Sequence, residues 1–522
     1  MDNRTVIAVV LSFLIIVGYQ FLFPAQQPEV PEQKQPAQQQ APEAAPVAAP
    51  KPLSETVAAD EREITVENSL FRAVFTSRGG TIKSWTVKPY KDKEGRDVVL
   101  LRKPGAVPAV GIGTDSTFDL AKVNFSSSGS NLLLDDARKT GTLVFEYAKD
   151  GTSVRRTYTF SSGSCMVDLT DEVSGPSEYW ITLGSDFGIF EQDSSIHVGP
   201  TILTGTDRKE LTATDLKEPK SFRDNLKWIA QEDKYFFSAL VPATPVDEAK
   251  AFMLQDSPVV AFRAKSGSNT FRLYAGAKEH DTLAALNIGL EHVIDFGFFS
   301  IIARPLFWVL KFFYAFLGNY GWAIILITIV TRIPFIPLLN KSQKSMKKLQ
   351  EIQPKMNEIK EKYKNDSQRM QKEMMELYKK HKVSPLGGCL PMLLQIPVFF
   401  ALYQVLLRAI ELRSAPFMLW ITDLSAPDTL IGHIPAMIPL IGGFAVGPLP
   451  LLMGATMFIQ QKMTPSSMDP TQAKMMLAMP IIFTFMFLNF ASGLVLYWLV
   501  NNILGIIQQY FVNKSLAQEQ AS

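Results

Sequence analysis

The segment ILITIVTRIPFIPLLNKSQKSMKK (residues 325–348) decides the class of this protein, because it joins a long apolar run to a lysine-rich stretch. An apolar run of this length is typical of a helix that crosses a bilayer. Arg332 nevertheless lies inside the run. A central arginine costs about 2.5–3.5 kcal/mol on insertion scales, so it requires a polar partner or water. The segment therefore predicts a membrane protein with a polar feature among its helices.

Further apolar segments accompany this one in a chain of 522 residues whose net charge is only +2. Residues 475–513 would form one helix of about 58 Å at 1.5 Å per residue, so we expect two spans that turn at NFASG. The amino-terminal run lacks a small-x-small cleavage site before Pro24, because Leu22 and Phe23 are large, and this favours an uncleaved anchor over a signal peptide. We therefore predict six spans, at residues 1–23 and at about residues 318–340, 386–408, 445–462, 475–490 and 493–512.

The region between the first two spans divides into two parts. Residues 24–59 are rich in Pro, Gln and Ala and contain no aromatic residue, so we expect a disordered tether. Residues 60–290 consist of short alternating segments such as REITVENSLFRAVFTS, separated by turn residues, and this pattern predicts an all-β sandwich. Nothing inside this domain reaches spanning length, so the whole domain should lie on one side of the membrane.

The segment FGFFSIIARPLFWVLKFFYAF (residues 296–316) is apolar but carries Arg304 and Lys311. These two residues are seven positions apart and project from one face of a helix. We interpret residues 291–316 as an amphipathic helix in the plane of the lipid headgroups. A true span is the alternative.

The loop at residues 341–385 holds 13 Lys and Arg against 6 Asp and Glu. The positive-inside rule therefore places it in the cytoplasm, which also places both termini there, including the tail at 514–522, and the β domain on the other side. Apolar residues on either side of KNDS recur at helical spacing, which predicts two antiparallel helices with a methionine-rich seam. The hairpin is either a plain solvated element or a docking arm, with candidate docking residues Lys347, Lys348, Met356, Tyr363, Met374 and Tyr378.

None of the five spans after residue 317 contains Asp or Glu, so Arg332 has no carboxylate partner of its own in them. The polar groups in these spans are otherwise neutral hydroxyls and amides. We predict a hydrated groove with one positive charge, formed by Arg332, Thr328, Gln395, Asn501 and Asn502. The alternatives are an arginine that extends to the membrane surface and amides that bond one helix to another.

Several motifs resemble one known family. They are GNYGWAIILITIVTRIPFIPL, EMMELYKKHKVSPLGGCLPMLLQIPVFFALYQVL, APFMLWITDLSAPD, MFIQQKM and MPIIFTFMFLNFASGLVLYWLVNN, in this order within residues 317–513. They are similar to the YidC membrane protein insertases of Gram-negative bacteria, and the likeness extends to the anchor, the tether and the β domain. The resemblance implies a five-helix core around a hydrophilic groove centred on Arg332, and an extracytoplasmic super-sandwich domain.

The same resemblance implies that this is an inner-membrane insertase and chaperone for nascent membrane proteins, acting alone or with the Sec translocon. The ribosome and a targeting particle are further expected partners through the hairpin, beside the lipid bilayer, and no sequence-specific binding of nucleic acid is expected. Clients would slide along the third and fifth spans, and an aromatic pair on the last span would lie nearby. The residues implied are Ile396, Pro397, Phe399, Leu402, Pro480, Ile481, Met486, Phe487, Tyr497 and Trp498.

Two departures from the family pattern stand out. The stretch TLIGHIPAMIPLIGGFAVG (residues 429–447) is longer than the loop expected there, and Trp498 stands where the family often has Tyr. A solute transporter or channel is the main alternative function, disfavoured because the spans lack acidic residues and do not form two matching halves. An enzyme or a sugar-binding protein acting through the β domain is a third alternative. It is disfavoured because the five His make no metal-spaced pair, no catalytic set emerges, and fold analogy alone does not establish sugar binding. We expect no cofactor, no metal and no disulfide between Cys165 and Cys389.

Overall fold

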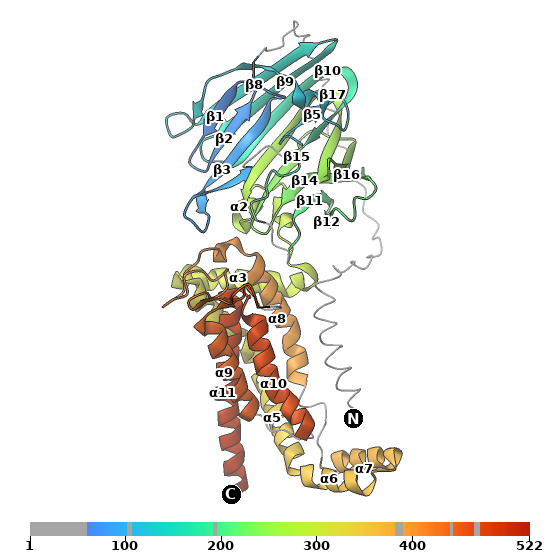
Figure 1. The fold of residues 1–522 in the computed structure, drawn as a ribbon, viewed down its shortest axis with the longest axis vertical. Helices are drawn as coiled ribbons and strands as arrows, with labels where there is room; N and C mark the ends of the chain where they lie inside the picture. Colours follow the sequence, from blue (N-terminus) through green and yellow to red (C-terminus); the bar gives the residue numbers. More distant parts are fainter. Residues whose placement is uncertain are drawn as a thin grey trace, which may run out of the picture. The chain divides into compact units, whose positions relative to one another are not determined.

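The computed structural model describes residues 60–101, 107–191, 196–381, 390–438, 442–463 and 470–521. Contacts divide the chain into two compact units, with the boundary after Ile294 (Figure 1). The first contains the two large sheets, and the second contains the long helices and a two-stranded hairpin. The predicted anchor at 1–23 and tether at 24–59 lie outside the described residues.

The first unit is a sandwich of two antiparallel sheets, as the alternating pattern predicts. The smaller sheet has the strand order β4-β3-β2-β1-β7, and only its β1–β7 pair is parallel. Its strands are β1 (Glu63–Glu67), β2 (Phe71–Thr76), β3 (Thr81–Lys91), β4 (Asp97–Leu101) and β7 (Leu132–Leu133).

The larger sheet follows the order β12-β11-β14-β15-β17-β10-β9-β8-β6, with β5, β13 and β16 attached to its side. Its strands are β5 (Ile112–Gly113), β6 (Ser126–Ser128), β8 (Thr140–Lys149), β9 (Thr152–Ser161), β10 (Met166–Thr182), β11 (Gly199–Thr204), β12 (Asp207–Glu210), β13 (Lys220–Phe222), β14 (Leu226–Glu232), β15 (Phe236–Pro242), β16 (Glu248–Leu254) and β17 (Ser257–Ala277). Short helices η1 (Asp119–Lys122), α2 (His280–Ala285) and η2 (Leu290–Val293) complete the unit.

The core lies between the two sheets, where alternate side chains of each strand point inward. Phe75 of the smaller sheet meets Tyr158 and Phe160 of the larger one, with ring centroids 4.9 and 5.5 Å apart. Aromatic pairs at these distances favour edge-on packing, and both of these pairs adopt it. The sandwich is therefore held by packing of side chains across the sheets.

A buried ion pair also joins the layers. Arg156 and Asp171 face each other on β9 and β10, are fully buried, and lie 2.9 Å apart between Nε and Oδ1. Arg156 also donates through Nη1 to the carbonyl oxygens of Val110, at 2.7 Å, and of Gly79, at 3.2 Å. The sequence pattern did not predict this pair, because the two residues meet only through strand register.

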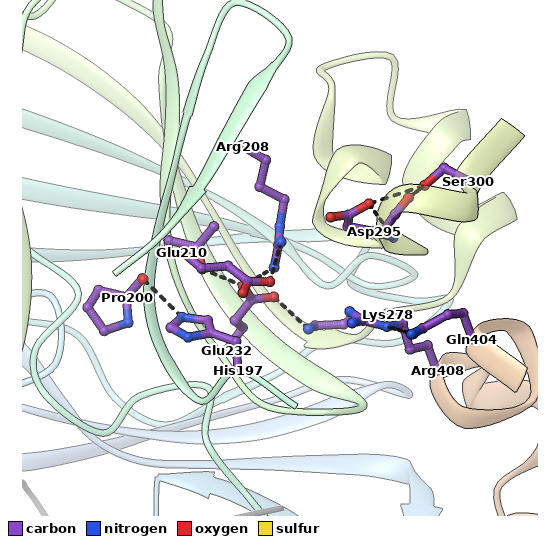
Figure 2. Close-up of polar contacts among 12 residues, drawn as sticks. His197, Pro200, Arg208, Glu210, Glu232, Lys278, Asp295, Ser300, Gln404 and Arg408 are labelled. Carbon is purple, nitrogen blue, oxygen red and sulfur yellow. Dashed lines mark hydrogen bonds and ion pairs between the residues drawn. The ribbon is translucent and has the colours of Figure 1, made fainter. Parts of the chain in front are cut away.

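A second buried cluster of charges surrounds Glu232 at the end of β14 (Figure 2). Lys278 donates to one carboxylate oxygen of Glu232 at 2.5 Å, and Arg208 and the Thr201 hydroxyl donate to the other. Burial by itself would raise the pKa of Glu232, but Arg208 and Lys278 hold that pKa at about 2. Glu232 is therefore a buried carboxylate that stays ionised because cations compensate it.

The second unit is a helical bundle preceded by a helix that lies crosswise to the long helices (Figure 1). Its elements are η3 (Gly297–Phe299), α3 (Ser300–Leu317), α4 (Tyr320–Arg332), η4 (Ile333–Phe335), α5 (Ile336–Glu351), α6 (Gln353–Lys362), α7 (Ser367–Lys380), α8 (Leu390–Arg408), η6 (Ile410–Leu412), α9 (Pro448–Met463), α10 (Pro470–Phe487) and α11 (Ser492–Ala521). A short hairpin of β18 (Gly432–His433) and β19 (Ala445–Val446) precedes α9.

The helix that contains the span expected at 318–340 is longer than that span. The helical path continues from Tyr320 to Glu351 through a short 3-10 segment at Ile333–Phe335. Pro334 and Pro337 stand at the first turns of η4 and α5, where a missing backbone N–H does least harm. The span therefore runs directly into the first half of the predicted lysine-rich hairpin.

Among the described residues, three helical segments are long and apolar enough to cross a membrane: 297–317, 320–351 and 492–515. Shorter apolar helices cover 395–408 and 476–487. The crosswise helix α3 is long and apolar enough to cross a membrane, although we expected it to lie flat. Its exposed face carries Ile301, Trp308 and Phe312, while Lys311 lies 5.6 Å from the Phe307 ring centroid. Length and composition therefore leave both interpretations of α3 open.

Candidate polar groove and its surroundings

Arg332 ends α4 and points toward α11. Its Nη1 donates to the backbone oxygen of Asn501 at 2.8 Å and also to the Asn501 side-chain oxygen, and its Nη2 donates to Gln508 Oε1 at 3.2 Å. The hydrogen-bond acceptors that the described residues offer to Arg332 are amide oxygens, and none of them is a carboxylate. The guanidinium is half-buried, so its charge is only partly screened by solvent. The positive charge is therefore oriented by neutral groups and is not cancelled by an anion.

A small hollow of about 10 Å³, partly open to the outside and about large enough for one water molecule, lies beside this guanidinium. Three polar residues that the sequence predicted contribute to its wall together with Arg332, namely Thr328, Gln395 and Asn501. The rest of the wall is formed by Thr331, Phe335, Leu339, Val398 and Tyr497. The lining thus combines one cation, several neutral donors and acceptors, and apolar surface from α4, α5, α8 and α11.

The hydroxyls on α4 do not stabilise the guanidinium. Thr328 donates to the Ile324 carbonyl at 2.6 Å, and Thr331 donates to the Ile327 carbonyl at 2.8 Å. Both bonds run within the helix, so each hydroxyl oxygen still has lone pairs that can accept a hydrogen bond. The two hydroxyls can therefore accept hydrogen bonds in the hollow, next to the guanidinium of Arg332, which donates them.

Asn502 does not belong to this hollow, contrary to the prediction. It is buried, and its amide donates to the Met453 carbonyl at 3.2 Å and to the Thr456 hydroxyl at 3.3 Å, which joins α11 to α9. Consecutive helical residues point about 100° apart, so Asn501 and Asn502 cannot both face Arg332. Asn502 thus follows the alternative of an amide that bonds one helix to another.

Gln508, one of the neutral amides of the predicted spans but not one of the five residues assigned to the groove, also contacts Arg332. It accepts from Arg332 and donates to Asn340 Oδ1 at 2.7 Å, so it links α11 to both α4 and α5. A signal for it was present, because Gln508 lies seven residues after Asn501 and therefore on the same helical face. The parallel spacing of Asn502 and Gln509 marks the face toward α9, where Gln509 donates to Met463 O at 2.6 Å.

An aromatic cluster occupies the region expected for sliding clients. The Trp498 ring of α11 lies 4.8 Å from Phe399 of α8, 6.0 Å from Phe483 and 5.2 Å from Phe487 of α10, measured between centroids. Tyr497 lies 6.2 Å from Phe399. Trp498 thus connects the third and fifth predicted spans.

The residues expected on the sliding faces differ in exposure. Ile481 and Met486 are 59% and 40% exposed, which suits a surface open to other molecules. Ile396, Pro397, Phe399 and Trp498 are half-buried. In contrast to the prediction of a sliding surface, four of these residues are buried within the bundle, namely Leu402, Pro480, Phe487 and Tyr497.

The lysine-rich hairpin has the predicted apolar seam. Leu349, Ile352 and Met356 are buried, and the residues packed against them include Met374 and Tyr378. Tyr363 ends α6 and lies 5.3 Å from the Arg369 guanidinium. Lys348 is exposed and Lys347 half-buried. Met356 therefore stabilises the hairpin from inside, whereas Lys348 lies on its surface.

Known proteins match this chain along both units. The family model described as "60Kd inner membrane protein" matches residues 312–519, and the one described as "YidC periplasmic domain" matches residues 63–309. A "Membrane protein insertase YidC" of Geotalea daltonii is 42% identical over 99% of this chain and 100% of its own length.

A relative of the same name from Pelobacter propionicus is 42% identical over 98% of this chain and 99% of its own length. A solved structure, "Active YidC insertase crystal structure with the first transmembrane domain resolved", covers 98% of this chain and 100% of its own, with 17% identity and a TM-score of 0.38. On the strength of the family models and the full-length sequence relatives, this chain belongs to the YidC family of membrane protein insertases.

Proposed function

We propose that this membrane protein insertase receives the polar or acidic part of its client beside Arg332. The family relationship supports the insertase function and gives no support to the transporter alternative, nor is this an enzyme family. The observation that carries the proposal is that the described partners of the guanidinium are neutral oxygens on α11. Its field therefore remains available to a visiting anion.

The proposed mechanism is energetic and involves no covalent step. A charged client segment loses hydration when it leaves the cytoplasm, and this loss is costly unless other polar groups replace the water. Arg332, Gln395 and the hydroxyls of α4 line the hollow and supply donors and acceptors. Burial of the apolar client segment in lipid, at about 25 cal/mol per Å², then drives insertion.

The exposed side chains of α10 provide the proposed exit toward lipid. Ile481, Ile482 and Phe485 are each about half exposed. A client helix that contacts them can leave laterally without crossing the whole bundle. Phe399 and Trp498 would contact the client on the side of α8.

We also propose a membrane topology and a set of binding partners for this insertase. The net charge of +7 over residues 341–385 supports a cytoplasmic hairpin, and this places both termini in the cytoplasm and the β domain outside the inner membrane. The exposed Lys348 and the other surface lysines of the hairpin suit an anionic partner such as the ribosome or a targeting particle. Nascent membrane proteins are the clients, and cooperation with the Sec translocon is proposed.

Photocrosslinking from single positions tests the proposed client path. A photoreactive residue at Phe399 or Met486 should capture a stalled nascent membrane protein, whereas one at Leu452 of α9, which is 47% exposed, serves as the matched control. Capture that is no stronger at Phe399 and Met486 than at Leu452 would contradict a defined path along α8 and α10.

A further inference from the structure

The connection between α8 and α9 contains an apolar hairpin, which we define by its described residues 429–438 and 442–447. The segment contains no Asp, Glu, Lys or Arg. Four large apolar side chains of this hairpin are exposed: Leu430 is 58% exposed, Ile431 63%, Met437 88% and Ile438 40%. An uncharged, apolar and exposed loop is not typical of a surface that faces only water.

Several backbone hydrogen bonds link the two sides of the apolar hairpin. Ile431 N–H donates to the Val446 carbonyl at 2.9 Å and Ile434 N–H to the Phe444 carbonyl at 2.9 Å. Nearer the tip, Gly443 N–H donates to the Ile434 carbonyl at 2.8 Å and Gly442 N–H to the Ile438 carbonyl at 2.9 Å. Internal pairing lowers the cost of moving a peptide backbone out of water.

A buried carboxylate fixes the base of the hairpin. Asp428 accepts from the N–H of Leu430 at 3.2 Å, from the N–H of Leu449 at 2.9 Å and from the indole of Trp420 at 3.0 Å. Gly447 passes so close that a Cβ there would lie 2.0 Å from Asp428 Cγ. Both ends of the hairpin are therefore attached at one point beside the first turn of α9.

We propose that the apolar hairpin inserts into the lipid interface around the bundle and acts as a membrane anchor for the α8–α9 connection. The hairpin leads directly into α9, whose first turns expose Leu451 and Leu452 at 47% each, so its apolar surface continues that of the helix in the span predicted at 445–462. The proposal uses the membrane location of the family and does not depend on the role given to Arg332.

Lipid fits this surface better than a protein partner does. A stable protein interface typically uses about 20–30 residues on each side, far more than the four exposed side chains here. The segment also lacks charges that could complement a polar partner. Lipid requires only apolar area and a backbone that is already paired.

Depth measurement in vesicles tests the proposal. The full chain carrying Cys165→Ser, Cys389→Ser and Met437→Cys is labelled with an environment-sensitive fluorophore and reconstituted into phosphatidylethanolamine and phosphatidylglycerol vesicles. Matched labels at Leu133→Cys, an apolar residue that is 62% exposed on β7, and at Leu452→Cys, on α9, give the aqueous and membrane references.

The label at position 437 should be quenched by shallow doxyl-labelled lipid several-fold more strongly than the label at 133, and should approach the label at 452. The label at position 437 should also be protected from aqueous iodide about as well as the label at position 452. Iodide access equal to that at 133 would overturn the proposal. Protection that disappears when protein is diluted in lipid would also overturn it, because it would identify a second copy of the chain as the cover.

Discussion

Arg332 on α4 donates to both the backbone oxygen and the side-chain oxygen of Asn501 on α11, and the first of these bonds is 2.8 Å long. A guanidinium requires several acceptors, and here one residue supplies two of them. Because both acceptors are neutral, the contact fixes the direction of the charge without cancelling it. Asn501 therefore orients the guanidinium of Arg332 and leaves its positive charge unneutralised.

Insertion of acidic clients should depend on the positive charge of Arg332. Arg332→Ala should reduce insertion of clients with an acidic translocated tail by roughly tenfold or more, which corresponds to about 1.4 kcal/mol. Arg332→Lys should retain much of the activity, because it keeps the charge while losing the forked contact with α11. The measurement is protease protection of the client in proteoliposomes, with a client that has an uncharged tail as control. Equal insertion of the acidic client by the Ala variant would contradict the assigned role.

Asn501→Asp places a carboxylate at the position that now holds a neutral oxygen. The variant should keep the α4–α11 contact and strengthen it, because an ion pair replaces a hydrogen bond from the guanidinium to a neutral oxygen. It should nevertheless insert acidic clients less well than the parent, since the new ion pair neutralises the field of Arg332. Thermal unfolding in detergent and client insertion are measured on the same preparation. If stability and insertion rise together, orientation is the whole role of the contact.

The sequence predicted the groove only in part, and the spacing of four amides explains why. Asn501 and Gln508 form one stripe toward α4 and α5, while Asn502 and Gln509 form another toward α9. Polarity alone does not separate these stripes. Only the seven-residue spacing, combined with knowledge of which helices α11 contacts, assigns each amide to its partner.

The two units differ in how far their folds could be predicted. Alternation of apolar residues identifies strands, so the sandwich of the first unit follows from local pattern. The pairing of Arg156 with Asp171 does not, because it depends on the register between β9 and β10. In the second unit, apolar runs identify membrane helices, but length and composition alone do not decide between a crossing and a flat helix for α3.

Trp498 should contribute to the stability of the bundle, because its ring contacts Phe399 on one helix and Phe483 and Phe487 on another. Removal of a buried aromatic side chain typically costs about 3–5 kcal/mol, and the cost here should be lower because Trp498 is only half-buried. Trp498→Ala should therefore lower the melting temperature in detergent more than Trp498→Tyr does. Equal melting temperatures for the parent and the Ala variant would show that the aromatic contacts add no stability.

The Glu232 cluster predicts acid sensitivity of the first unit. The pKa of Glu232 lies at about 2 in the folded protein, below the ordinary value of 4.5, so folding favours the ionised carboxylate. This contribution is fully present above the unfolded pKa and is lost as pH falls from about 4.5 to about 2, by at most roughly 3 kcal/mol. The protection factors of the β14 and β17 amides, which correct for the intrinsic pH dependence of hydrogen exchange, should therefore fall over this range in the full chain.

The matched variant for the cluster is Glu232→Gln. It keeps the shape but leaves Arg208 and Lys278 without the negative charge, so β14 should exchange faster at neutral pH and depend less on pH between 4.5 and 2. A variant with the same steep acid dependence as the parent would assign that dependence to other carboxylates.

The carboxylate of Asp428 should hold the base of the apolar hairpin closed. Three donors converge on its carboxylate, from Leu430, Leu449 and Trp420, and all three would lose their acceptor in Asp428→Ala. Each unsatisfied buried donor costs about 1–3 kcal/mol, so the base of the apolar hairpin should open in this variant. Exchange of the Ile431 and Ile434 amides, which are bonded across the hairpin, should accelerate by at least tenfold, whereas amides of the β domain should be unchanged. Gly447→Ala should reproduce the effect without removing the carboxylate, because its Cβ would overlap Asp428. If neither variant changes this exchange, the strand pairing alone holds the hairpin together.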